Sequence, residues 1–297
     1  MKPIAILSAD IHRQEQIPVC RTDDFFSEQE RKLMWLDDLQ QKYGCPVLDS
    51  GDLFSHWKPS PWLITSTLMY LPDEFYTVPG NHDLPGHNIN LLNKSGLAVL
   101  EAAGRVTIAL EPIVKGNFVI HPFPYGSELK PLTKKSNGVL DVAICHAMVY
   151  QGKEPWPGCT DPDSSRFLRK MKGYDLVLTG HNHKPFTEDL SGRLLVNPGS
   201  LMRRTADQWD HRPRVYLWYP DNTIEAVFVP IAEGVISREH LEKKVAKDER
   251  MASYVQKLSE TEYELSSKFE ENLEKIYQQN KIRQSVKDLI NTAMGEG

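Results

Sequence analysis

Short apolar runs, each followed at once by polar residues, recur through the first third of the chain. They occupy residues 4–8, 47–48 and 75–78, and each has a length suited to a buried strand. Between them, Leu33, Leu36 and Leu39 recur at helical spacing, and Pro61 suits the first turn of a helix that extends to residue 69. The alternation predicts parallel strands joined by right-handed helical crossovers, and ligands bind at the carboxyl ends of such strands.

The sequence indicates where one of these helices begins and ends, and it predicts another helix further along the chain. Ser27 followed by Glu30 is a capping-box pattern, and Gly44 and then Pro46 indicate where the same helix ends. A further helix is expected over residues 88–103, where leucines supply most of the apolar positions.

The middle of the chain has shorter apolar runs separated by glycine and proline. Runs at 106–110, 113–114 and 118–121 predict strands of a second sheet with an antiparallel bias. Residues 150–160 contain Trp156 and predict a surface loop over the edge where the strands end. Further strands are expected at 139–145, 174–179, 194–196, and, as a closing hairpin, 215–219 and 224–229.

The last sixty or so residues differ in character from the rest. From Arg238 onward there is no proline, and glycine is absent until Gly295. Apolar residues recur there at spacings that predict long amphipathic helices. We therefore expect a globular domain over residues 1–233 and a helical tail over residues 234–297. The apolar positions of the tail are Leu258, Leu265, Phe269, Leu273, Ile276, Val286 and Leu289.

Composition narrows the class of protein only slightly. The 297 residues are 40% hydrophobic and 25% charged, which is ordinary for a globular protein, and the net charge of −5 provides no general attraction to nucleic acid or membranes. Binding of a polyanion would require a local basic patch or metal ions. The four cysteines show no paired spacing, and neither a signal peptide nor a membrane span is recognisable, so we expect a cytoplasmic protein.

Carboxylate, amide and imidazole side chains gather at the ends of the expected strands. Two carboxylates, one amide and four imidazoles form a mixed oxygen and nitrogen set that suits two divalent transition metals, whereas a structural zinc site would use cysteines or a closed tetrahedral set. Asp52 is the natural candidate for a bridging carboxylate. The seven candidate ligands are Asp10, His12, Asp52, Asn81, His146, His181 and His183.

Each candidate ligand alone has a simpler interpretation. Asp10 would most often be a helix cap, Asp52 a turn acid like its neighbour Asp49, and His146 a hydrogen-bonded core histidine. His181 and His183 alternate along a strand end, which is compatible with surface exposure alone. These simpler interpretations become improbable together, because all seven residues follow strands in one consistent order.

The order D-x-H, G-D, G-N-H-D, a lone His and G-H-x-H resembles the calcineurin-like metallophosphoesterases over residues 4–230. The resemblance implies an α/β fold, a four-layer αββα sandwich of two mixed β-sheets, here with a C-terminal helical extension. It implies one metal at Asp10, His12, Asp52 and His183, and a second at Asp52, Asn81, His146 and His181. His82 takes the position of the family's catalytic acid, and Asp83 that of its supporting carboxylate.

The resemblance also implies a mechanism. A hydroxide activated by two metals attacks phosphorus in line, and His82 protonates the leaving oxygen. Mn²⁺ is the metal that we expect first, with Mg²⁺, Fe²⁺ and Zn²⁺ as alternatives.

The segment from Gly51 to Ser60 is similar to one found in SbcD-like DNA repair nucleases. Those enzymes often place a second functional histidine directly after the phenylalanine, where this chain has Ser55, with His56 one residue later. Five side chains are candidate phosphate contacts, and each is equally or more readily explained as an ordinary solvated residue. They are Arg13, His56, Lys58, Arg203 and Arg204.

The favoured hypothesis is therefore a metal-dependent DNA exonuclease or endonuclease. In SbcD-like proteins, helices after the catalytic domain dock on the coiled coil of an SMC-like ATPase, and the tail would suit such docking. Homodimerisation, or packing of the tail on the catalytic domain, is the alternative. A small-molecule or nucleotide phosphodiesterase or phosphatase is the alternative function, because Asn197-Pro198-Gly199-Ser200 resembles the ending of compact phosphodiesterases. A non-catalytic scaffold is a third hypothesis, which the complete ligand set disfavours.

Overall fold

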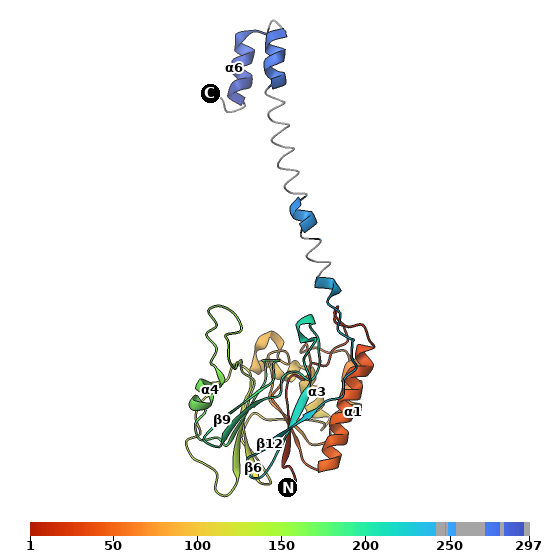
Figure 1. Cartoon of the computed structure of the whole chain (residues 1–297), viewed down its shortest axis with the longest axis vertical. Coiled ribbons are helices and arrows are strands. Elements are labelled where there is room, and N and C mark those ends of the chain that lie inside the picture. The colour runs from red at the N-terminus through yellow and green to blue at the C-terminus, as the bar shows by residue number, and fades with distance from the viewer. Residues whose placement is uncertain (242–246, 248, 254–270, 280–281, 294–297) are drawn as a thin grey trace. The chain divides into compact units, whose positions relative to one another are not determined.

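The computed structural model describes the chain except residues 242–246, 248, 254–270, 280–281 and 294–297 (Figure 1). The chain divides into two compact units, Met1–Ser237 and Arg238–Gly297. Within the described ranges, every helix is too short or too polar to traverse a lipid bilayer.

The first sheet of the N-terminal unit has six strands in the order β12-β11-β1-β2-β3-β4. The four strands from β1 to β4 are parallel, and the hairpin of β11 and β12 adds antiparallel strands beside β1. The closing hairpin predicted from the sequence is confirmed. The strands are β1 (Ala5–Ser8), β2 (Val47–Asp49), β3 (Phe75–Thr77), β4 (Thr107–Ile108), β11 (Arg214–Trp218) and β12 (Ile224–Phe228).

The second sheet has six strands in the order β5-β6-β7-β8-β10-β9. Its four central strands are parallel and only its two edge strands run antiparallel, so the predicted antiparallel bias is wrong for the centre of this sheet. The strands are β5 (Ile113–Lys115), β6 (Phe118–Phe123), β7 (Leu140–Cys145), β8 (Leu176–Thr179), β9 (Phe186–Leu190) and β10 (Arg193–Asn197).

Helices cover the outer faces of both sheets. Figure 1 shows α1 on one side of the paired sheets and α4 on the other. The helices of the N-terminal unit are α1 (Phe25–Tyr43), α2 (Pro61–Tyr70), α3 (Gly96–Ala102) and α4 (Ser164–Lys170), with 3₁₀ turns η1 (Pro85–His87), η2 (Ile89–Lys94) and η3 (Ala206–Gln208).

Two helix predictions require correction. Helix α1 is capped by Asp24, whose carboxylate accepts a hydrogen bond from the Ser27 amide, so Ser27 lies inside the helix and not at its cap. The expected helix over 88–103 is broken, because Ser95 adopts an extended conformation and caps a new helix, α3, after the 3₁₀ turn η2.

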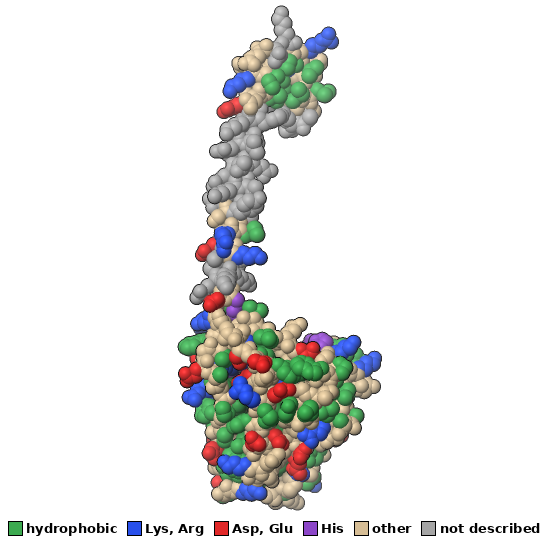
Figure 2. Space-filling view, turned by 90° about the vertical axis from the view of Figure 1, so that its right-hand side faces the viewer, with side chains coloured by type: hydrophobic (Ala, Val, Ile, Leu, Met, Phe, Trp, Pro, Cys, Tyr) green, Lys and Arg blue, Asp and Glu red, His purple; other side chains and the backbone are tan. Residues whose placement is uncertain are grey.

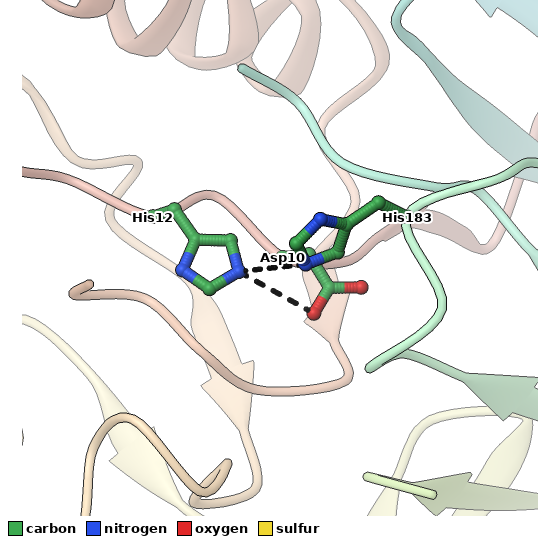
Figure 3. A group of neighbouring side chains, drawn as sticks. All are labelled: Asp10, His12 and His183. Carbon is green, nitrogen blue, oxygen red and sulfur yellow. Dashed lines mark hydrogen bonds and ion pairs between the residues drawn. The ribbon is translucent and has the colours of Figure 1, made fainter. Parts of the chain in front are cut away.

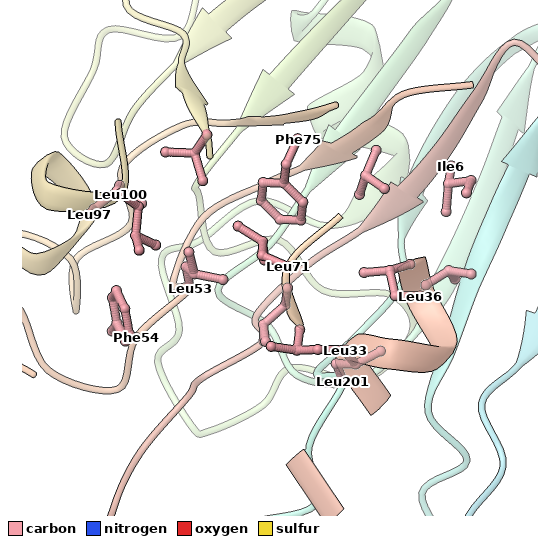
Figure 4. Close-up of a cluster of buried hydrophobic side chains, with 14 of the residues drawn as sticks. Ile6, Leu33, Leu36, Leu53, Phe54, Leu71, Phe75, Leu97, Leu100 and Leu201 are labelled. Atoms are coloured by element: carbon pink, nitrogen blue, oxygen red, sulfur yellow. The ribbon is translucent and has the colours of Figure 1, made fainter. Parts of the chain in front are cut away.

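Three layers of buried apolar side chains hold the N-terminal unit together. The first lies between the first sheet and α1 to α3 (Figure 4), the second between the two sheets, and the third between the second sheet and α4. Along β1 the side chains alternate, with Ile6 in the first layer and Ala5 and Leu7 in the second. The predicted sandwich of two mixed sheets between helices is thereby confirmed.

The C-terminal unit contains helix α6 (Gln284–Ala293) and a preceding helical stretch over residues 271–279. The Tyr277 hydroxyl donates a 3.4 Å hydrogen bond to Asn291, and Lys287 lies over the Tyr277 ring. Figure 2 shows hydrophobic side chains grouped on this part of the unit, where Ile276, Val286 and Leu289 are exposed. Of the apolar positions predicted for the tail, Leu258, Leu265 and Phe269 lie outside the described residues.

Candidate metal centre

The loops that follow β1, β2, β3, β7 and β8 meet at one edge of the molecule and bring the predicted ligands together. Two groups of side chains each have potential ligand atoms within 4.8 Å of one another. The first is Asp10, His12 and His183 (Figure 3), and the second is Asp52, His146 and His181.

In the first group the imidazoles face one another and a carboxylate. His12 Nε2 lies 3.0 Å from His183 Nε2 and 3.9 Å from Asp10 Oδ1. Burial and the nearby Arg204 charge lower the pKa of His12, and the same two causes lower the pKa of His183 to about 4. Both imidazoles are therefore neutral at physiological pH, the state in which a ring nitrogen binds a metal.

In the second group a hydrogen bond selects which His146 nitrogen is free. His146 Nδ1 donates to the Ser50 carbonyl at 2.7 Å, which directs Nε2 toward the other ligands. Asn81 Oδ1 lies 3.0 Å from that Nε2 and 2.8 Å from His181 Nδ1. Asn81 therefore joins this group, as the sequence predicted for it.

Asp52 lies between the two groups. Its Oδ2 atom is 3.7 Å from His12 Nε2 and 3.4 Å from His146 Nε2, while its Oδ1 accepts the amide of His82 at 2.8 Å. Burial acts to raise the pKa of Asp52, but the charge of His146 and its hydrogen bond to the carboxylate lower that pKa below its usual range. The carboxylate is thus ionised and one of its oxygens faces both groups.

The donor set fits divalent metal ions. Asp10 Oδ2 and His12 Nδ1 are buried and have no hydrogen-bond partner among the described residues. Burial raises the pKa of Asp10 to about 8, so its ionised form requires a nearby cation at neutral pH. Carboxylate, amide and imidazole donors suit a transition metal or Mg²⁺ better than a soft metal.

The backbone at this edge is held in a conformation that few residues adopt. Asp10, His12, Asp52 and His181 have φ angles of 49°, 53°, 57° and 72°, in the left-handed region. Such conformations persist only where surrounding contacts require them, and they concentrate at functional sites.

His82 and Asp83 have different partners from those that the sequence indicated. His82 Nδ1 donates to the Ser55 carbonyl at 2.9 Å, which leaves Nε2 available for substrate. The Asp83 carboxylate does not contact the imidazole; it accepts the backbone amides of Asp52, Phe54 and Gly80. Asp83 therefore joins the loops after β2 and β3, and any support that it gives His82 acts through the backbone.

The five predicted phosphate contacts have different surroundings. Arg13 is buried and donates to Ser66 and Thr67, and Arg203 is buried and donates to the carbonyls of Trp209 and Ala232. Arg13 also lines the pocket that contains Arg204. Because a loop arginine that finds internal acceptors turns inward, these bonds favour a structural role, and contact with a substrate phosphate stays a prediction for both. His56 and Lys58 are exposed at the rim of a pocket, and Arg204 lines the same pocket.

Sequence reasoning missed three polar residues at the site. Ser55 and Gln14 both accept hydrogen bonds from Arg204. Asp49, expected to be a turn acid, is fully buried and accepts from Ser8 and Thr77 as well as from the amide of Gly51. The one available signal was Ser55 itself, which stands where the resemblance implies a histidine.

Two pockets adjoin the candidate ligands. One of about 640 Å³ is lined by His181 and His183 together with Trp209, Arg212 and Arg214. The other, of about 490 Å³, is lined by residues that include Ser55, Lys58 and Arg204. Both pockets therefore carry basic side chains beside the candidate metal centre.

Comparisons with known proteins identify the family of the chain. A probable metallophosphoesterase of Methanothermobacter thermautotrophicus is 31% identical over 94 residues, which are 32% of this chain and 49% of that protein. The chain thus spans about half the length of this curated relative.

Solved structures of similar proteins include an archaeal phosphodiesterase with 12% identity and a TM-score of 0.40. The matched region covers 76% of this chain and 99% of the phosphodiesterase chain. A putative 5'-nucleotidase from Staphylococcus aureus, with 14% identity and a TM-score of 0.41, covers 82% of this chain and 58% of its own. The family model of the calcineurin-like phosphoesterase superfamily domain matches residues 4–216, which is most of the chain. The chain therefore belongs to the calcineurin-like phosphoesterase superfamily.

Proposed function

We propose that the protein is a metal-dependent phosphodiester hydrolase with a binuclear centre, and that it acts as a DNA nuclease. The observation that carries the binuclear centre is the position of Asp52, whose Oδ2 lies 3.7 Å from His12 and 3.4 Å from His146. Two divalent ions, Mn²⁺ first, would supply Lewis-acid activation of water and charge neutralisation at the phosphate.

His82 is the proposed catalytic acid. The Ser55 carbonyl accepts the hydrogen of its Nδ1, so the ring is oriented and its Nε2 can donate a proton when the imidazole is protonated. His82 belongs to neither group of ligands, so its removal should leave the metals bound.

The basic pockets support a nucleic-acid substrate. Trp209, 57% exposed, lines the pocket that contains His181 and His183, and Arg212 and Arg214 line it as well. An exposed indole beside basic side chains suits a stacked base and its phosphates, without selecting a base sequence. Because the net charge of −5 gives the whole molecule no attraction to DNA, binding would depend on such a local patch or on the metal ions.

The test is the degradation of labelled single- and double-stranded DNA with Mn²⁺ by the wild type and by His82→Ala. We expect DNA degradation by the wild type and a loss of about 10²–10⁴-fold in His82→Ala, with metal content unchanged. His121→Asn is the matched control, because His121 lies on β6 and bonds Asp141, away from the ligands. Rapid hydrolysis of a nitrophenyl diester with no action on any DNA would instead establish a small-molecule or nucleotide phosphodiesterase.

We further propose that the tail docks on the coiled coil of an SMC-like ATPase. Val286 is 46% exposed and Leu289 is 73% exposed, which leaves apolar positions available to a partner helix. Leu289→Glu should abolish co-elution with a coiled-coil ATPase, whereas Lys287→Glu, which also changes charge on α6, should reduce it less. A concentration-dependent dimer that Leu289→Glu dissociates would identify a second copy of the chain as the occupant.

A further inference from the structure

The pocket beside Ser55 contains an arginine fixed by neutral groups. Arg204 Nη1 donates to Ser55 Oγ at 2.6 Å and to Gln14 Oε1 at 3.0 Å. The backbone of Gln14 is held in turn by the side chain of Gln29 on α1. The Gln14 backbone amide donates to Gln29 Oε1 at 2.9 Å, and Gln29 Nε2 donates to the Gln14 backbone carbonyl at 3.0 Å. The guanidinium is thus positioned before any ligand arrives.

The charge of Arg204 has no bound counterion in the protein. Within the described part of the chain, no carboxylate lies at ion-pair distance from it, and its two acceptors are a hydroxyl and an amide oxygen. Glu15 also lines the pocket, but its Oε1 accepts the amide of Ser60 at 3.0 Å. Arg13 also lines the pocket, and Lys58 adds a further positive charge at its rim. A planar guanidinium with no partner carboxylate is a suitable donor for phosphate.

The lining of this pocket is distinct from the two groups of candidate metal ligands. None of the seven candidate ligands lines it. Ser55 connects it to the catalytic acid, since its carbonyl accepts from His82 Nδ1 while its hydroxyl accepts from Arg204. An anion bound here would therefore lie near His82 and next to the residue that orients its ring.

We propose that Arg204, assisted by Lys58, binds a phosphate that neighbours the scissile phosphate of an oligonucleotide. This inference rests on the proposed nuclease function and adds its substrate class, a chain with at least one further phosphate beyond the bond that is cut. Ser55 and Gln14 are positioning residues that hold the guanidinium in place.

The test uses dinucleotides that differ only in a terminal phosphate. The full chain with Mn²⁺ is assayed on TpT, pTpT and TpTp, as wild type, Arg204→Gln, Arg204→Lys and Arg169→Gln. Arg169 is the matched control, because it is exposed in the last turn of α4 and lies outside both pockets. The wild type should cleave one of the phosphorylated dinucleotides about tenfold or more faster than TpT in kcat/KM, as expected for one charge-assisted phosphate contact.

That preference should disappear in Arg204→Gln, persist in Arg169→Gln and be partly restored in Arg204→Lys, which keeps the charge but not the planar fork. Binding of a fluorescent oligonucleotide to the metal-free protein provides a second readout. In that measurement, Arg204→Gln should reduce the magnitude of the slope of log affinity against log salt concentration by about 1, which corresponds to the loss of one phosphate contact.

Three results would overturn the proposal while leaving the nuclease function intact. These are a wild type that cuts all three dinucleotides equally, a preference that Arg204→Gln retains, and an equal loss on all three substrates, which would place Arg204 at the scissile phosphate. A wild type that cleaves a nitrophenyl diester but neither the dinucleotides nor longer DNA would overturn the nuclease function and this inference together.

Discussion

At the scale of single residues, the close approach of the strand-end loops depends on a missing side chain. A Cβ atom at Gly80 would lie 2.1 Å from Asp52 Oδ1 and 2.5 Å from the Asp52 amide nitrogen. Gly80→Ala should therefore displace Asp52, weaken metal binding at least tenfold and cost about 2 kcal/mol of stability through overpacking. Calorimetric titration with Mn²⁺ and urea denaturation measure the two effects.

The control for this prediction is Gly104→Ala. Gly104 has a φ of +71°, but a Cβ atom added there would have no heavy atom within 4 Å, so the new methyl group meets open space. We expect a small loss of stability there, of about 1 kcal/mol from the left-handed backbone, and no change in metal affinity. Unchanged Mn²⁺ affinity in Gly80→Ala would show that the Asp52 loop can relax around the methyl group.

The buried Lys32 on α1 should make the stability of the fold depend on pH. Its ammonium group is buried, bonds the Leu201 carbonyl and pairs with Glu28, and burial lowers its pKa to about 7 from 10.5. Between these two pH values the unfolded chain binds more protons than the folded one, so this residue makes stability rise with pH from about 7 to 10.5.

Measured by urea denaturation of metal-free protein, the wild type should gain on the order of 1–2 kcal/mol relative to Lys32→Met between about pH 7 and pH 9. The comparison with Lys32→Met cancels the contributions of other titrating groups. A difference between the two proteins that stays constant over this range would contradict the assigned shift.

The predictable part of the candidate site consists of residues whose role follows from their place on a strand. Asp52 and His146 were recognisable because each stands in the turn after a buried strand, and the ends of parallel strands meet. The partners of Arg204 were not recognisable, because Ser55 and Gln14 are 149 and 190 residues away and no local pattern joins them. The internal acceptors of Arg13 and Arg203 were not recognisable for the same reason, since they come from other elements.

At the scale of elements, the residue that caps α1 differs from the one that the sequence pattern indicated: the cap is Asp24 and not Ser27. The Asp24 carboxylate accepts from both the amide and the hydroxyl of Ser27. Asp24→Ala should lower the melting temperature by about 2–3 °C, whereas Ser27→Ala, which keeps the capped amide, should lower it by less. A larger loss in Ser27→Ala would restore Ser27 as the cap.

Element types were more predictable than their pairing. The strand expected at 106–110 exists as β4, but it pairs in parallel with β3 at the edge of the first sheet. Edge strand β9 was missed, because its side chains alternate between buried and exposed over five residues that include Thr187, Glu188 and Asp189. The sequence of a short edge strand carries little information about its partner, since half of its side chains face water.

At the scale of the whole molecule, the division into units bears on where the metals are bound. All seven candidate ligands belong to the unit Met1–Ser237. The end of this unit lies four residues after residue 233, where composition led us to expect the domain to end. A chain of residues 1–237 should therefore fold and bind metal without the rest.

Because an ion that binds only the folded state stabilises it by mass action, Mn²⁺ at about one hundred times its dissociation constant should add roughly 2.7 kcal/mol. For a unit of this size that corresponds to a rise in melting temperature of about 5–10 °C, equal in the full chain and in 1–237. Asp52→Asn should lose most of the rise in both, because it removes the carboxylate that faces both groups. If Mn²⁺ raised the melting temperature of the full chain but not that of residues 1–237, residues after Ser237 would be needed to complete the metal centre.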